Sequence, residues 1–124
     1  MNTRRKGSLA IGAAINHFTS KGMTVLLPIA DCDLYDLVIG HDGVLEKIQC
    51  KYTDYKQPNG GYNIDLRTFG GYRKKTYHLR YKNGDFDFLF IYCGNGQKYL
   101  IPAEKVIDKS HIVVGSRSWN EYKC

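Results

Sequence analysis

An Asp-Gly pair between two runs of strand-forming residues constrains this chain more than any other feature. Residues 34–53 read LYDLVIGHDGVLEKIQCKYT, with Asp42 and Gly43 at the centre. A two-residue hairpin loop needs positive φ at both central positions, and Asp-Gly accepts this readily. The pattern therefore predicts a β-hairpin in which His41 pairs with Val44.

This hairpin gathers polar side chains on one patch of sheet. Counting back from the turn sets Asp36 opposite Gln49, with Lys51 on the same face and opposite Leu34. Carboxylate and amide oxygens are hard ligands suited to Mg²⁺, and the carbonyl of Cys50 offers another oxygen. A nearby ammonium stabilises the charge that develops on a phosphodiester under attack. The pattern indicates metal-assisted phosphodiester hydrolysis; the alternative is an ordinary sheet face with a solvated ion pair.

The rest of the chain favours one mixed domain spanning residues 1–124, because 124 residues suit a single core. A helix is expected to open at Gly7-Ser8 and to close at Lys21-Gly22. Strands or short strands are expected at 23–30, 35–41, 44–53, 62–68, 86–93, 97–103 and 111–115, with a helical turn at 103–107. The strand at 23–30 should be buried, and those at 86–93 and 97–103 should form a hairpin. The predicted class is α/β, in the sense of a mixed α+β sheet.

Charge points to a polyanionic partner. The chain has 18 Lys and Arg against 12 Asp and Glu, a formal net charge of +6. Nucleic acid and an acidic membrane surface both suit such a chain, and charge for solubility alone is the alternative. No apolar run is long enough to span a membrane. The start resembles a secretory signal, but its apolar stretch is short, so we expect a cytoplasmic protein with reduced cysteines.

A basic and aromatic stretch covers residues 66–82, LRTFGGYRKKTYHLRYK. Its backbone is hard to assign, with helix slightly favoured over 69–83. Cations at this density neutralise phosphates, and arginine also reads guanine edges. The candidate DNA-binding residues are Arg67, Arg73, Lys74, Lys75, Arg80 and Lys82. The alternative is a solvated basic surface whose tyrosines pack into the core.

Residues 6–53, and more loosely 83–102, resemble the PD-(D/E)XK nuclease superfamily. The similarity is carried by the glycine-opened helix, by GMTVLLPIADCDLYDLVI and by LEKIQCKYT, and it is greatest to the homing endonucleases encoded in group I introns. The resemblance implies a restriction-endonuclease-like core, a mixed central sheet flanked by helices. It also implies that Asp36 and Gln49, with the Cys50 carbonyl, bind Mg²⁺ (Mn²⁺ able to substitute), and that Lys51 is the active-site lysine.

The same resemblance implies a site-specific endonuclease that cuts double-stranded DNA as a dimer or tetramer, without a membrane or a small-molecule cofactor. Two features depart from the family pattern: Gln49 replaces an acid, and Ile11 stands near the place of a helix glutamate. Acids near in sequence are Asp31, Asp33 and Glu46, of which Glu46 has the wrong strand parity. The alternatives are a Holliday junction resolvase, a restriction or repair nuclease of the same fold, or a DNA-binding protein with little cutting activity.

Overall fold

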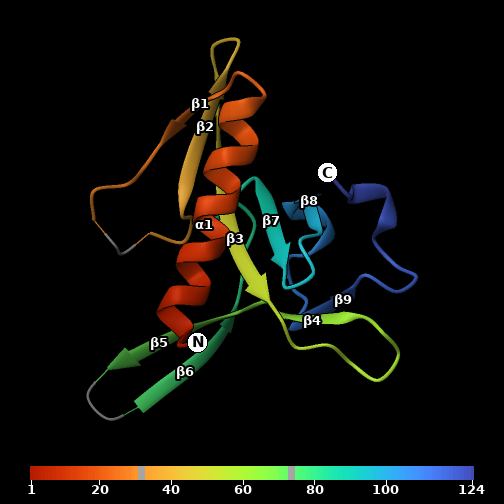
Figure 1. Cartoon of the computed structure of the whole chain (residues 1–124). Helices are drawn as coiled ribbons and strands as arrows, with labels where there is room; N and C mark the ends of the chain where they lie inside the picture. Colours follow the sequence, from red (N-terminus) through yellow and green to blue (C-terminus); the bar gives the residue numbers. More distant parts are fainter. Residues whose placement is uncertain (31–32, 73–74) are drawn as a thin grey trace.

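The computed structural model describes residues 1–30, 33–72 and 75–124, with the backbone only for 68–72 and 75–78 (Figure 1). Its elements in chain order are α1 (Thr3–Ser20), β1 (Thr24–Leu26), β2 (Leu37–His41), β3 (Val44–Thr53), β4 (Tyr62–Asp65), β5 (Arg67–Tyr72), β6 (Lys75–Arg80), β7 (Phe88–Cys93), β8 (Lys98–Pro102), the 3₁₀ turn η1 (Ala103–Lys105), β9 (His111–Val114) and the 3₁₀ turn η2 (Asn120–Tyr122).

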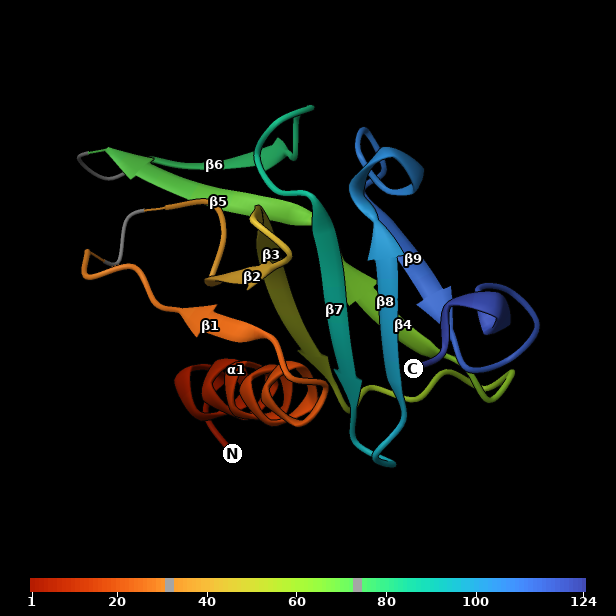
Figure 2. The same ribbon diagram turned by 90° about the horizontal axis from the view of Figure 1, so that it is seen from above.

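A five-stranded mixed sheet forms the centre of the fold, in the order β1-β2-β3-β7-β8. The β3 and β7 strands are parallel, and the other neighbours are antiparallel. Helix α1 covers one face, and the antiparallel pair of β4 and β9 covers the other (Figure 2). The mixed α+β class is confirmed, with a strand pair in place of a second helical layer.

Helix α1 begins four residues before the expected Gly7-Ser8, because Asn2 caps it. The Asn2 side chain accepts a hydrogen bond from the Arg5 amide at 2.9 Å, which satisfies one of the free donors of the first turn. At the other end Gly22 takes a φ of +82°, as a helix-ending glycine does. No helix in the described part of the chain is long and apolar enough to cross a membrane.

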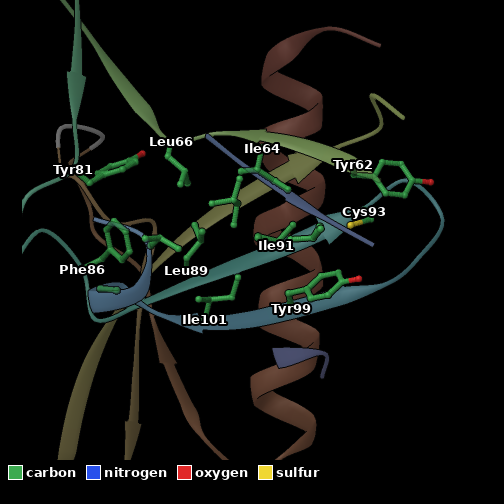
Figure 3. Close-up of a cluster of buried hydrophobic side chains, with 14 residues drawn as sticks. Tyr62, Ile64, Leu66, Tyr81, Phe86, Leu89, Ile91, Cys93, Tyr99 and Ile101 are labelled. Carbon is green, nitrogen blue, oxygen red and sulfur yellow. The ribbon is translucent and has the colours of Figure 1, made fainter. Parts of the chain in front are cut away.

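Two hydrophobic cores lie on opposite faces of the sheet. The core under α1 holds Ala10, Ala14, Phe18, Leu37, Ile39, Ile48, Cys50 and Phe90. The core under β4 and β9 holds, among others, Ile64, Leu89, Ile91, Tyr99, Ile101, Ile112 and Val114 (Figure 3). Because side chains alternate along a strand, Ile48 and Cys50 face the helix, so Gln49 and Lys51 face away from it.

The expected buried strand at 23–30 is wrong. The β1 strand covers only Thr24–Leu26 at the edge of the sheet, and Leu26, Leu27 and Ile29 are exposed. The β1 strand ends at Leu26, two residues before Pro28. Proline has no N–H to donate to a β-ladder, so the strand does not continue through it. This apolar run therefore lies at an edge of the sheet, and Met23 and Val25 are its members that pack against the core under α1.

Most other expected elements are confirmed. The Asp42–Gly43 turn has φ of +51° and +78°, and its strands pair from His41↔Val44 to Leu37↔Ile48, as counted from the sequence. The β7–β8 hairpin, the short β4 and β9 strands and the turn at Ala103–Lys105 lie where they were expected.

Candidate active site

The end of the β2–β3 hairpin brings the expected site residues together. The regular pairing stops at Leu37 and Ile48, so Asp36 leaves the expected register. Its amide donates to the Ile48 carbonyl at 2.8 Å, one residue out of step, and its carboxylate accepts from the Cys50 amide at 2.8 Å. The expected direct pairing of Asp36 with Gln49 is thus replaced by a carboxylate that reaches across to the next residue of β3.

Oxygen atoms converge around this carboxylate. In a strand the N–H and C=O of one residue face the same neighbour, so the Cys50 carbonyl is directed to the side from which Asp36 reaches its amide. The Gln49 side-chain nitrogen donates to that carbonyl at 3.4 Å. A carboxylate, an amide and a main-chain carbonyl therefore lie within one small region, as the sequence predicted from a simpler register. The Cys50 thiol faces α1 and is buried, and burial raises its pKa, so the thiol itself is inert.

Lys51 lies next to these groups in a half-buried position. Its ammonium sits over the ring of Tyr81, 5.5 Å from the ring centroid. Burial lowers the pKa of Lys51, and the carboxylates of Asp65 and Asp36 oppose that fall. Two acids thus act on one lysine, and only Asp36 was expected there.

A first pocket, here called the Asp36 pocket, opens beside the carboxylate with a volume of about 290 Å³. Its lining residues are Ile11, Leu27, Pro28, Ala30, Asp33, Tyr35 and Asp36. Helix α1 contributes Ile11, so an apolar side chain occupies the place where the family resemblance implies an acid. Of the acids considered from sequence, Asp33 lines this pocket, Glu46 instead bonds His41 at 2.6 Å, and Asp31 lies outside the described residues.

A second pocket, here called the Lys51 pocket, has a similar volume of about 290 Å³. It is lined by Thr3, Lys6, Gly7, Cys50, Lys51, Tyr52, Ile64 and Asp65. Asp65 accepts hydrogen bonds from the Arg67 amide at 2.9 Å and from its guanidinium at 3.1 Å through each carboxylate oxygen. These bonds lower the pKa of Asp65. Sequence reasoning missed this acid because the loop at 54–61 leaves the position of β4 relative to β3 undetermined; the alternation of YNID was the only signal.

The basic stretch forms a hairpin rather than the slightly favoured helix. Strands β5 and β6 pair from Arg67↔Arg80 to Tyr72↔Lys75 and project from the end of the molecule where α1 begins (Figure 1). Paired glycines cost a helix about 1 kcal/mol each, and Thr, Tyr and Phe favour strands. The composition of Arg67–Arg80 therefore indicated a two-stranded arm, and we use that name, the arm, for β5 and β6.

The arm and its base carry the expected DNA-binding residues. Arg67 and Arg80 pair across the base, where Arg67 binds Asp65 and Arg80 donates to the Asp108 carbonyl at 2.9 Å. Lys82 is exposed just beyond the arm. Lys75 starts β6, and Arg73 and Lys74 lie outside the described residues. The described cations therefore stand on a projection beside the Lys51 pocket.

Fold, site and comparisons agree on the class of protein. A family model described as PD-(D/E)XK endonuclease matches residues 1–120, and the chain belongs to that family. It is a nuclease built on a mixed sheet, and the resemblance expected from sequence is confirmed.

Two individual proteins are similar to it along most of their length. Protein 5.3 of Escherichia phage T7 is 32% identical over 101 residues, which cover 82% of this chain and 80% of that protein. The solved structure of the bacterial homing endonuclease I-Ssp6803I matches with a TM-score of 0.86 and 29% identity, over 99% of this chain and 89% of that one.

Proposed function

We propose that this protein is a site-specific endonuclease of the homing type, which hydrolyses phosphodiester bonds in double-stranded DNA with the help of Mg²⁺. One observation carries the proposal: the Asp36 carboxylate bonds the Cys50 amide, between Gln49 and Lys51. This arrangement brings one acid, two neutral oxygens and one lysine together at the end of the β2–β3 hairpin, where two pockets open. The whole chain, residues 1–124, acts as one nuclease domain in the cytoplasm.

The donor set of this site fits Mg²⁺. Asp36, the Gln49 amide oxygen and the Cys50 carbonyl would hold the ion, and Mn²⁺ would substitute. Mg²⁺ binds in proteins through one or two carboxylates together with substrate phosphate and water, so one acid and two neutral oxygens suffice in a DNA complex. When bound, the ion polarises the scissile phosphate and lowers the pKa of a bound water.

Lys51 assists the attack on the phosphate. Its ammonium is attached to the same strand as two of the oxygen donors, and it faces away from α1 with Gln49. A positive charge fixed beside the phosphate stabilises the extra negative charge of the transition state and orients the attacking water. Because the side chain is partly withdrawn from water, this interaction is stronger than at an exposed lysine.

The arm supports DNA binding next to this site. It projects from the same end of the molecule as the start of α1, which lines the Lys51 pocket (Figure 1). A duplex lying along this end would meet Arg67, Arg80 and Lys82 of the arm and its base. Two-stranded ribbons fit the major groove of B-form DNA, so the arm suits both phosphate contact and base contact.

The active species is a homo-oligomer, a dimer or a tetramer. One chain carries one set of Asp36, Gln49 and Lys51, and each set hydrolyses one strand at a time. Two sets related by a two-fold axis match the pseudo-symmetry of a duplex. Analytical ultracentrifugation with and without target duplex tests this, and a monomer that makes double-strand breaks would contradict it. Near the end of the chain, Trp119 and Tyr122 are partly buried and pack against the core under β4 and β9.

Cleavage of a randomised duplex library, with and without Mg²⁺, tests the proposed function. Defined cut sites that appear only with the metal are the expected result. Preferential cutting of four-way junctions would favour a resolvase. Tight binding without any cutting would favour a DNA-binding protein that has lost catalysis, a candidate that Ile11 in the Asp36 pocket supports.

A further inference from the structure

The base of the arm lies against the catalytic lysine. Asp65 ends β4 two residues before the first arm pair, and Tyr81 follows directly after β6. The pairing of Arg67 with Arg80 holds these two chain segments side by side. Asp65 lines the pocket of Lys51, and the Tyr81 ring lies under the Lys51 ammonium. Each strand of the arm therefore adjoins a residue that contacts or lies beside the Lys51 side chain.

The Tyr81 ring is a rigid support. Only 4% of the residue is exposed, and its ring packs edge-to-face on Phe86 with centroids 5.0 Å apart and an angle of 84° (Figure 3). A ring held in the core cannot turn away when the lysine moves. A cation over the face of an aromatic ring is attracted by its negative π surface, most strongly where water is partly excluded.

Asp65 is a second fixed point. Three hydrogen bonds from Arg67 hold its carboxylate, although the side chains of Asp65 and Arg67 are 40% and 42% exposed. An orientation set by a guanidinium fork is well defined even near solvent. The other lysine of the pocket, Lys6 of α1, pairs instead with Asp54 at 3.2 Å. The negative charge of Asp65 is therefore directed to Lys51 and Arg67.

We propose that Tyr81 and Asp65 are positioning residues for Lys51, so that the base of the arm holds the ammonium where the scissile phosphate arrives. The inference rests on the proposed function in taking Lys51 as the active-site lysine. The ring supports the ammonium on one side and the carboxylate attracts it from another, so loss of either leaves a flexible lysine with several conformations. DNA bound along the arm then meets a lysine whose place is fixed by that same arm.

Four variants separate positioning from stability. Tyr81→Leu removes the ring, and Tyr81→Phe keeps the ring and removes only the hydroxyl. Tyr99→Leu is the matched control, because Tyr99 is a fully buried tyrosine of the same core on β8, away from Lys51. Asp65→Asn removes a charge at a half-exposed position and spares the core. Thermal melting would show that both Leu variants lose stability, as large-to-small core substitutions do.

Single-turnover cleavage and DNA affinity are then measured for each variant. A misplacement of about 1 Å in a catalytic group costs as much as about 100-fold in rate. We expect Tyr81→Leu to lower kcat by roughly 10- to 100-fold with an unchanged Kd for DNA, and Asp65→Asn to lower kcat several-fold without weaker DNA binding. Tyr81→Phe and Tyr99→Leu should cut at the wild-type rate. Wild-type kcat in Tyr81→Leu, or an equal loss in Tyr99→Leu, would overturn the proposal.

Nuclear magnetic resonance of the Lys51 side chain gives a second measurement that does not require cutting. Protons next to the ammonium lie over the ring, so their signals should be shifted upfield in the wild type, in Tyr81→Phe and in Tyr99→Leu. The shift should disappear in Tyr81→Leu. If the wild type cuts no DNA, the proposed function fails. The shift of this signal still tests whether the Lys51 ammonium is held over the Tyr81 ring. An unshifted wild-type signal would overturn the proposal whatever the activity.

Discussion

The Asp36 pocket and the Lys51 pocket have equal volumes of about 290 Å³, yet the residues that line them differ in character. Helix α1 gives the first an apolar residue, Ile11, and gives the second Thr3 and Lys6. The loop before β2 supplies the acid of the first, whereas Asp65 at the base of the arm supplies the acid of the second.

This difference indicates that one pocket suits metal binding and the other suits the placing of Lys51. The Asp36 pocket offers the carboxylate that reaches β3 at the Cys50 amide, so it suits a hard cation. In the Lys51 pocket the acid is already bound by Arg67, so it suits the placing of a lysine rather than a metal. We therefore infer that the second acid does not replace the missing helix acid, and that the site holds its metal weakly until DNA phosphate completes the coordination.

The largest change in cleavage rate should come from a substitution in the Lys51 pocket. Lys51→Ala removes the charge that assists attack, and we expect the cleavage rate to fall by at least about 100-fold. DNA affinity should stay near the wild-type value, because we propose that the arm makes most phosphate contacts. Single-turnover cleavage beside a gel-shift titration checks both. An equal loss of binding and cutting would mean that Lys51 only binds DNA.

The arm should govern the salt dependence of binding. Replacing Arg73, Lys74 and Lys75 with alanine should reduce the slope of log affinity against log salt by up to about 3, because each lost phosphate contact removes about one unit. A matched control replaces Lys21, which ends α1, together with Lys98 at the start of β8 and Lys123, which bridges to Tyr99 of that strand. If the control triple flattens the slope as much as the arm triple does, the DNA-binding surface lies elsewhere.

Adding an acid to the Asp36 pocket should strengthen its binding of Mg²⁺ and so increase its difference from the Lys51 pocket. Ile11→Glu sets a carboxylate beside Asp36, and a second acid suits Mg²⁺ coordination. We expect half-maximal cleavage at a Mg²⁺ concentration lower by several-fold. Gly12→Glu is the control, since a side chain there meets open space on the exposed face of α1. An unchanged or higher Mg²⁺ requirement in Ile11→Glu would contradict a metal in this pocket.

The smallest expected effect is on the pH dependence of stability, through His17 in the core under α1. His17 is packed against Phe18 and Phe90, and burial together with Lys98 and Lys21 lowers its pKa. Below the ordinary histidine pKa of about 6.5, the unfolded chain binds a proton at His17 more readily than the folded chain does. The stability that comes from a neutral, buried His17 is therefore present above that pH and is lost as the pH falls through it. Urea unfolding between about pH 8 and pH 5 should show a smaller loss for His17→Gln than for the wild type. Parallel losses would contradict this.

The sequence predicted the site best where local geometry decides it. Asp42–Gly43 determines the hairpin register through its positive φ angles, so the neighbourhood of Asp36, Gln49 and Lys51 followed from counting alone. Its finer detail did not follow. Asp36 leaves the ladder and bonds the Cys50 amide, because a carboxylate can satisfy a main-chain donor where the partner strand has ended.

Features that depend on distant contacts were missed. Asp65 comes to Lys51 through the packing of β4 on the far face of the sheet, and Tyr81 comes through the pairing of the arm. The backbone of residues 69–83 was left unsettled, with helix slightly favoured, although the glycines and β-formers of the arm indicated strands. Edge strand β1 was taken as buried because composition does not distinguish a core strand from an edge.

Cleavage and binding by Asp36→Asn test the central claim most directly. The substitution keeps the size of the side chain and an oxygen that accepts from Cys50, but removes the charge that a metal requires. The account predicts loss of Mg²⁺-dependent cutting on the duplex that the wild type cuts, with unchanged affinity for that duplex and an unchanged melting temperature. Full cutting by Asp36→Asn would contradict the proposed site.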